Sequence, residues 1–274
     1  MDVQEIAREA FAVLGTGRQV APFSARWPDF RLEDAYRVAA AVRTQRETRG
    51  ERPVGRKIGF TNRTIWAEYN VHAPMWGYLY DRTVRDLPKG SMGASLRGLA
   101  EPRIEPEIVF GLAAAPTPGM NERALLGCID WVAHGFEIVQ SIFPNWTFLA
   151  ADTIAAYGLH GALWIGPRHS VASRSADWRR ELSGFEIDLF RNGVLVDHGR
   201  AANVLDGPIF ALASRGIACC RPAQSAACHR GDCHDWNAHA RLSGCERRRM
   251  DHGTDRHSAR RRAHSVRLSR VLIR

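Results

Sequence analysis

The chain has 274 residues, 45% of them hydrophobic, so it is long enough to bury the core of one large domain or two small ones. It contains no run of 18 apolar residues and no basic-then-apolar start, which disfavours a transmembrane or secreted protein and makes a cytoplasmic location the expectation. The net charge of +9 is uneven, because residues 1–214 carry 24 basic and 24 acidic side chains, whereas residues 215–274 carry 14 arginines and 5 acids.

Hydrophobic periodicity predicts a mixture of helices and strands in the first 214 residues. Apolar side chains at helical spacing predict helices at 3–14, 31–50, 61–70, 121–133 and 149–158, with another beginning near 203. Apolar runs and alternation predict strands at 54–60, 77–84, 103–112, 134–142 and 159–166, and a hairpin over 185–199 that turns at Asn192-Gly193. The order lacks a regular strand–helix–strand repeat, which favours an α+β fold.

The segment "RIEPEIVF" at 103–110 carries the most informative chemistry. Alternate side chains of a strand share a face, so Glu105 and Glu107 point the same way with backbones about 6–7 Å apart. Two carboxylates this close on an apolar strand repel each other unless a cation or proton intervenes. A cation site and a solvent-facing edge strand, where Pro106 is tolerated, are both compatible with this pattern.

Two further acids occur in apolar surroundings. Glu137 in "HGFEIVQSI" could join the pair as a third oxygen ligand, and three carboxylates suit a hard cation such as Mg²⁺. The alternative is an outward-facing strand residue. Asp152 could support the same site, or it could be a helix N-cap.

Lys57 is unusual because the chain has two lysines and 36 arginines. The pKa of a lysine can be shifted by burial, which makes Lys57 in "GRKIGF" a candidate proton-transfer group. A surface lysine without a special role is the alternative.

Five segments in this order and spacing resemble one enzyme family: "GRKIGFTNRTI", "GYLYD", "PRIEPEIVFGL", "HGFEIVQSIFPNW" and "AADTIAAYGLHGAL". They are similar to the 2-keto-4-pentenoate hydratase and 4-oxalocrotonate decarboxylase family of the fumarylacetoacetate hydrolase superfamily. The resemblance covers residues 1–212. It implies an α+β fold with a mixed, barrel-like sheet core and flanking helices, a bound Mg²⁺ or Mn²⁺, a small 2-keto acid substrate and a homo-oligomer.

The resemblance also implies roles for particular residues. It implies metal ligation by Glu105, Glu107 and Glu137, and an acid/base role for Lys57 and Asp81. The expected reaction adds water to a 2-hydroxy-2,4-dienoate and gives a 4-hydroxy-2-keto acid, as in the catabolism of aromatic compounds. Decarboxylation of a 2-keto acid of the 4-oxalocrotonate type uses the same enolate chemistry and is the alternative.

The segment after Asp152 departs from the family pattern. Asp152 matches an Asp-Thr pair near the site, and hydratases of the family often continue with Asp-Asn-Ala-Ser, whereas this chain has "AAYGLH". We therefore expect Tyr157 and His160 to bind the substrate or to support the residues that do.

Residues 213–274 lack the glycine-bearing strand, close to Ile-Val-Thr-Thr-Gly-Thr-Leu-Thr, that the resemblance predicts. The codons for Asp232 to Ala240, read from their second base, permit that sequence at every position, and Trp236 forces the glycine. We therefore hypothesise that this basic tail is a frameshifted, disordered translation. Such a tail would leave a sheet edge exposed, so weak or no activity is expected of this chain.

The tail also permits a different class of function. Five of the six cysteines and six of the eleven histidines lie in it, and Cys228, Cys233, His234 and His239 could bind zinc. Their spacing lacks the paired pattern of a zinc finger. Its arginine runs favour only unspecific electrostatic binding of nucleic acid, so neither a specific nucleic acid nor a membrane is an expected partner.

Overall fold

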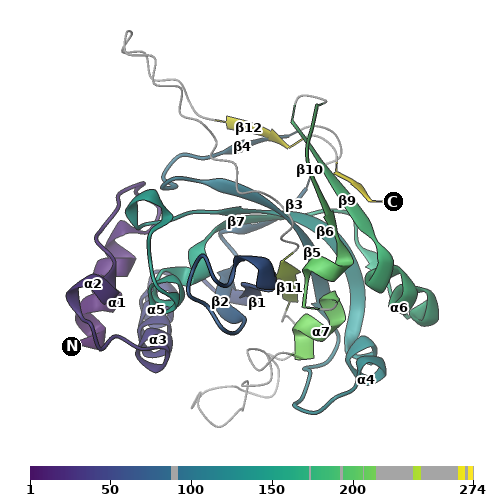
Figure 1. The fold of residues 1–274 in the computed structure, drawn as a ribbon, viewed down its shortest axis with the longest axis horizontal. Helices are drawn as coiled ribbons and strands as arrows, with labels where there is room; N and C mark the ends of the chain where they lie inside the picture. Colours follow the sequence, from purple (N-terminus) through teal and green to yellow (C-terminus); the bar gives the residue numbers. More distant parts are fainter. Residues whose placement is uncertain are drawn as a thin grey trace.

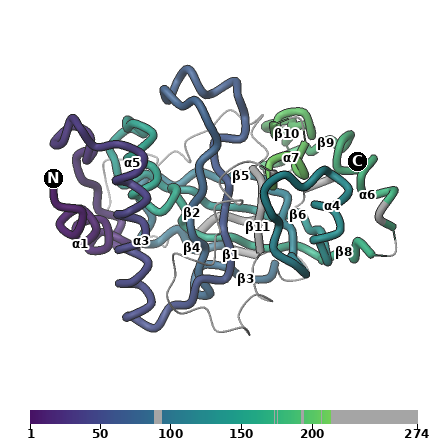
Figure 2. The backbone as a smooth tube through the Cα atoms, turned by 90° about the horizontal axis from the view of Figure 1, so that it is seen from below, coloured from purple at the N-terminus to yellow at the C-terminus, as the bar shows by residue number. Residues whose placement is uncertain are grey.

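The computed structural model describes residues 1–87, 92–172, 174–191, 194–205, 207–213, 237–241, 265–268 and 271–273. Within these ranges a large mixed sheet lies between two groups of helices (Figure 1). Helices α1, α2, α3 and α5 gather on one side, and α4, α6 and α7 gather on the other, an arrangement that the second view repeats (Figure 2). The predicted α+β class is confirmed.

The described α-helices vary from one turn to nearly five turns. Their bounds are α1 (Val3–Val13), α2 (Phe23–Arg26), α3 (Leu32–Thr48), α4 (Glu122–Gly127), α5 (Ala150–Ala155), α6 (Ser175–Gly184) and α7 (Pro208–Ala213). Short 3₁₀ helices are η1 (Arg63–Ile65), η2 (Pro144–Trp146), η3 (Tyr157–Leu159) and η4 (Ala201–Asn203).

The described strands form three sheets. Their bounds are β1 (Pro53–Gly59), β2 (Met75–Tyr80), β3 (Val84–Asp86), β4 (Met92–Ser95), β5 (Arg103–Leu112), β6 (Ile129–Val139), β7 (His160–Ile165), β8 (His169–Ser170), β9 (Glu186–Arg191), β10 (Val194–Arg200), β11 (Asn237–Arg241), β12 (Ser265–Leu268) and β13 (Val271–Ile273). The main sheet has the order β2-β1-β11-β5-β6-β7-β3, with β8 paired to β6. This is an open path from β2 to β3, not a closed ring.

The helices on the α1 side form one hydrophobic core with the sheet. Asp2 caps α1 by accepting a hydrogen bond from the Gln4 amide, and the helix buries Ile6, Ala7, Ala10 and Val13 as its periodicity predicts. This face packs against α3 and α5, and residues of all three helices belong to one buried cluster. A second cluster joins the sheet to α4, α6 and α7.

Two helices predicted from the sequence are wrong in type or extent. Residues 61–70 were expected to form a helix, but only the 3₁₀ helix η1 (Arg63–Ile65) lies there. Residues 121–133 were expected to be helical throughout, but α4 ends at Gly127 and β6 begins at Ile129. The apolar residues from Ile129 onward pair with β5, and tertiary pairing therefore overrides a pattern that also fits a helix. The predicted hairpin is present as β9 and β10, and Asn192-Gly193 lies outside the described residues.

Most of the tail also lies outside the described residues, including Cys228, Cys233 and His234. The expectation that the tail would leave a sheet edge exposed where the expected strand belongs is wrong for the described backbone, because β11 lies between β1 and β5. It pairs in parallel with β1 and antiparallel with β5. Among the described helices, none has the length and apolar character needed to cross a membrane.

Candidate metal centre and active site

Three glutamates meet on one face of the main sheet. Glu105 on β5 lies directly opposite Glu137 on β6, and Glu107 follows two residues along β5 on the same face. One carboxylate oxygen from each lies within 4.8 Å of the others, and all three side chains are buried. The alternatives of a solvent-facing edge for Glu105 and Glu107, and of an outward-facing Glu137, are therefore wrong.

Pro106 lies between the two glutamates of β5 and faces Phe136 on β6. The described register of β11 with β5 runs from Asn237 opposite Gly111 to Arg241 opposite Glu107. By the alternation of the strand, the two glutamates on either side of Pro106 share a face.

Lys57 reaches this carboxylate cluster from β1. Its Nζ lies 2.8 Å and 2.7 Å from the two carboxylate oxygens of Glu137, and the side chain is 3% exposed, so the surface alternative is wrong. In the strand order β11 and β5 lie between β1 and β6, which a flat sheet would place about 14 Å apart. The sheet therefore curves around the face that carries Lys57 and the glutamates.

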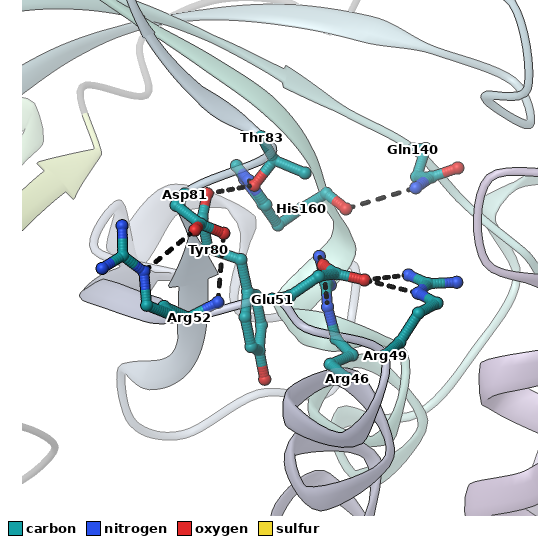
Figure 3. A network of polar contacts seen from close by, with 9 residues as sticks. All are labelled: Arg46, Arg49, Glu51, Arg52, Tyr80, Asp81, Thr83, Gln140 and His160. Carbon is teal, nitrogen blue, oxygen red and sulfur yellow. Dashed lines mark hydrogen bonds and ion pairs between the residues drawn. The ribbon is translucent and has the colours of Figure 1, made fainter.

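His160 holds Glu137 from the other side. Its Nδ1 lies 2.7 Å from Glu137 Oε1 and its Nε2 lies 2.9 Å from Thr83 Oγ1. Burial lowers the pKa of His160, although the hydrogen bond that His160 makes to the Glu137 carboxylate opposes that shift. Gln140 donates to the His160 carbonyl, which fixes the backbone of this residue (Figure 3). His160 therefore lies in position to orient Glu137.

The charge and chemistry of the carboxylate cluster fit a divalent cation. Three buried carboxylates lie within 4.8 Å of one another, and the Lys57 ammonium contacts one of them, Glu137. An all-oxygen donor set is the type that Mg²⁺ or Mn²⁺ binds. Among the residues that the structure describes, this is the one group of three or more such side chains with that geometry.

A pocket opens beside the cluster. Its lining combines Lys57 and Glu105 with a mainly apolar wall made of Gly59, Phe60, Met75, Trp76, Gly77, Val139, Trp146, Thr153, Gly158 and Leu159. At the pocket wall β2 approaches η3 closely, since a Cβ atom at Gly77 would lie 2.9 Å from the Tyr157 carbonyl oxygen. The pocket thus offers a charged end and a hydrocarbon-lined wall.

The structure does not bring Asp81 to the carboxylate cluster. Its carboxylate accepts hydrogen bonds from the Arg52 amide at 3.0 Å and the Arg52 Nε at 3.3 Å (Figure 3). Partial burial raises the pKa of Asp81, but these hydrogen bonds from Arg52 outweigh it and lower the pKa below its usual value. Asp81 lies four residues beyond Gly77, the register partner of Lys57, which is about 13 Å along the strand.

Asp152 and Tyr157 form contacts that join helices. Asp152 accepts hydrogen bonds from Ser24 and from the Leu149 amide, and it is the third residue of α5 rather than its N-cap. The Tyr157 hydroxyl donates to the carbonyl of Ala10 in α1, and burial raises its pKa. The Asp152 contact ties α2 to α5 and the Tyr157 contact ties α1 to η3, beside the pocket wall.

Several residues of this region were not identified from the sequence. Thr83 contacts His160 across 77 residues. Phe60 lines the pocket from a loop and Trp146 from the 3₁₀ helix η2, so the positions of all three depend on tertiary structure. Arg103 could have been identified, because the same alternation that groups Glu105 with Glu107 places Arg103 on their face.

Comparison with known proteins finds relatives that are named as hydratases. The chain is 30% identical over 219 residues to 2-keto-4-pentenoate hydratase 2 of Dechloromonas aromatica (strain RCB), covering 78% of this chain and 80% of the relative. It is 29% identical over 212 residues to 2-hydroxyhexa-2,4-dienoate hydratase of Comamonas testosteroni, covering 77% and 78%. No protein-family model matches.

A solved structure shows the same fold. The 4-oxalocrotonate decarboxylase from Pseudomonas putida G7, complexed with magnesium and adipate, superimposes with a TM-score of 0.74 at 20% sequence identity, covering 99% of this chain and 92% of that one. The curated relatives are hydratases and decarboxylases, which places the chain in the class of lyases. The chain belongs to the 2-keto-4-pentenoate hydratase and 4-oxalocrotonate decarboxylase family.

Proposed function

We propose that this chain is a divalent-cation-dependent hydratase that adds water to a 2-hydroxy-2,4-dienoate. The observation that carries the proposal is the convergence of Glu105, Glu107 and Glu137 with Lys57 beside a largely apolar pocket. The relatives named above as hydratases of this substrate class support it. We further expect the protein to act as a cytoplasmic homo-oligomer.

The carboxylate cluster would hold the cation. Glu105, Glu107 and Glu137 would ligate Mg²⁺ or Mn²⁺, which when bound supplies Lewis-acid polarisation of the substrate's 2-oxygen. His160 and Lys57 both contact Glu137, so they set the orientation of this carboxylate. Loss of a residue that holds a metal ligand in this way typically lowers metal affinity or activity by about 10–100-fold.

Lys57 is the group best placed to move a proton. In the reaction, the substrate loses the proton of its 2-hydroxyl and gains one at C5, which leaves a 2-oxo-3-enoate. Water then adds its hydroxyl to C4 and a proton to C3, giving the 4-hydroxy-2-keto acid. Lys57 lines the pocket and touches the cluster, so its Nζ can exchange a proton with a substrate carbon. The role implied for Asp81 remains a prediction, and no described contact links Asp81 to Lys57.

The pocket wall suits the rest of such a substrate. Phe60, Met75, Val139 and Leu159 present hydrocarbon to the side where a dienoate chain would lie. Burying this chain also limits the access of bulk water to the enolate. Decarboxylation of a 2-keto acid is the second candidate, favoured by the fold shared with 4-oxalocrotonate decarboxylase.

The test is a metal-dependent assay with two chains. The 274-residue chain and a chain with the reading frame restored after about residue 213 are compared on 2-hydroxypenta-2,4-dienoate with and without Mg²⁺. We expect Mg²⁺-dependent hydration by the restored chain and little by the other. Absence of hydration in both chains contradicts the hydratase, while equal activity and equal thermal stability contradict the frameshift hypothesis. Stoichiometric zinc in place of Mg²⁺ dependence supports the metal-binding tail instead.

A variant pair then tests the carboxylate cluster. Glu105→Gln removes a ligand charge with little change in volume, whereas Glu186→Gln alters an exposed glutamate that also lies on a strand. Turnover by Glu105→Gln at the wild-type rate would show that this carboxylate cluster is not the active site.

A further inference from the structure

Arg103 lies on the active-site face of β5. It precedes Glu105 by two residues, so the alternation of the strand places it on the face that carries Glu105 and Glu107. Its register partner on β6 is Val139, and both Val139 and Glu105 line the pocket. The base of the Arg103 side chain is therefore flanked by two residues of the pocket wall.

Its guanidinium group is held by aromatic rings of the same region. The guanidinium carbon lies 3.9 Å from the centre of the Trp146 ring, and Trp146 lines the pocket. The guanidinium also donates a hydrogen bond to the Tyr69 hydroxyl, and the Tyr69 ring packs 5.8 Å from that of Phe60, another residue of the wall. Stacking and a hydrogen bond fix the plane of the guanidinium without neutralising its charge.

Arg103 forms no ion pair with a carboxylate in the described residues, although Glu105 and Glu101 lie near enough to raise its pKa against the lowering caused by burial. Its Nε is buried without a hydrogen-bond partner among the described residues. Arg26 offers a contrast, since it stacks over Trp27 at 4.6 Å and also binds Glu9 at 2.7 Å. A half-buried, oriented guanidinium with donors to spare is suited to bind a carboxylate from outside the chain.

We propose that Arg103 recognises a carboxylate of the substrate and selects the anionic acid over uncharged analogues. This inference rests on the proposed function, because a 2-hydroxydienoate or a 2-keto acid supplies that carboxylate. The carboxylate is either the one next to the keto carbon or a distal one in a dicarboxylic substrate. Arg103 lies one alternation, about 6–7 Å, from Glu105, which is within reach of both ends of a short acid.

Calorimetric binding of non-reacting ligands to the full chain tests the proposal without requiring turnover. The ligands are 2-oxopentanoate, its methyl ester and the dicarboxylate 2-oxoadipate, each with Mg²⁺ present. We expect Arg103→Gln to weaken binding of the acids by about 10- to 100-fold, the usual range for a charge-assisted hydrogen bond. Binding of the methyl ester should change less than about twofold.

Two further variants control for structure. Arg103→Lys keeps the charge but loses the planar stack, so a smaller loss than that of Arg103→Gln is expected, and this variant serves if the glutamine variant does not fold. Arg26→Gln removes an arginine stacked on tryptophan outside the pocket and should leave binding unchanged.

The pattern of losses identifies the carboxylate. Equal losses for 2-oxopentanoate and 2-oxoadipate assign Arg103 to the shared carboxylate, and a loss confined to 2-oxoadipate assigns it to the distal one. Unchanged acid binding by both Arg103 variants, or an equal loss for the methyl ester, overturns the inference about Arg103 and leaves the proposed function standing. If neither the 274-residue chain nor the frame-restored chain binds any of the keto acids, the proposed function is overturned as well.

Discussion

Two groups of charged side chains in the interior of this molecule differ in the signs of the charges that they bring together. The carboxylate cluster of Glu105, Glu107 and Glu137 carries three acids, and Lys57 contacts one of them. The arginine cluster of Arg46, Arg49 and Glu51, at the junction of α3 and β1, has one acid between two guanidinium groups (Figure 3).

The signs of the charges that meet in each group indicate what the group does. In the arginine cluster, Glu51 is almost fully buried, and Arg46 binds it at 2.6 Å while stacking 3.6 Å from the centre of the Tyr80 ring. Partners within the chain satisfy this acid, so the cluster joins elements of the fold. In the carboxylate cluster, by contrast, three buried carboxylates lie within 4.8 Å of one another, and a bound cation would relieve their repulsion. Burial alone does not distinguish the two groups, whereas the crowding of like charges does.

The largest expected effect is on activity at the carboxylate cluster. Glu105→Gln should abolish Mg²⁺-dependent hydration in the frame-restored chain, because a ligand charge is lost. Its thermal stability should not fall, since removing one of three crowded negative charges reduces their repulsion. Steady-state kinetics and thermal melts measure the two properties. A variant that unfolds instead would make the cluster structural, like the arginine cluster.

The next effect concerns the lysine of the carboxylate cluster. Lys57→Arg keeps the positive charge near Glu137 but replaces the ammonium by a guanidinium, which does not give up its proton in proteins. Exchange of solvent deuterium into the substrate carbon, followed by NMR, should slow by about 10²–10⁴-fold. Among the described residues, no other lysine offers a matched Lys-to-Arg control. Asp81→Asn, at the other residue with an implied acid/base role, is therefore the companion variant. An unchanged exchange rate in Lys57→Arg and a large loss in Asp81→Asn would reverse the two assignments.

The arginine cluster should respond in stability rather than in activity. Arg46→Met leaves Glu51 buried with only the partly exposed Arg49, which should lower the free energy of unfolding by about 3–5 kcal/mol. The double variant Arg46→Met with Glu51→Met removes both charges and should recover much of that loss. Denaturant titration measures both. A double variant as unstable as the single one would mean that the packing of Arg46 on Tyr80, not its charge, is what matters.

The smallest expected effect is a pH dependence that comes from His160. Burial holds the pKa of His160 below its ordinary value of 6.5, so the unfolded chain binds a proton more readily than the folded one. The resulting stability is present above about pH 6.5 and declines as the pH falls below it. His160→Asn should flatten this part of the profile of unfolding free energy against pH, whereas a change at the exposed His72 should not. A steeper decline in His160→Asn would contradict the assignment.

Local pattern was enough to locate much of the site. The alternation of "RIEPEIVF" gives the shared face of Glu105 and Glu107, and the scarcity of lysine singles out Lys57. The apolar surroundings of Glu137 suggested a third ligand, and the family resemblance implied the same role. Its carboxylate meets the others although it lies 30 residues beyond Glu107. The contacts of Asp152 and Tyr157 with the N-terminal helices could not be foreseen, because they join segments 128 and 147 residues apart.

The sequence by itself determined which segments become the amphipathic helices and strands, and which acids share a strand face. Those properties depend on the periods of the backbone, which act over a few residues. Only the tertiary structure decided that the sheet curves enough for Lys57 to reach Glu137, that Asp81 pairs with Arg52, and that Arg103 stacks on Trp146 beside the pocket. These outcomes depend on the packing of distant segments, which brings charges together at distances that no local spacing specifies.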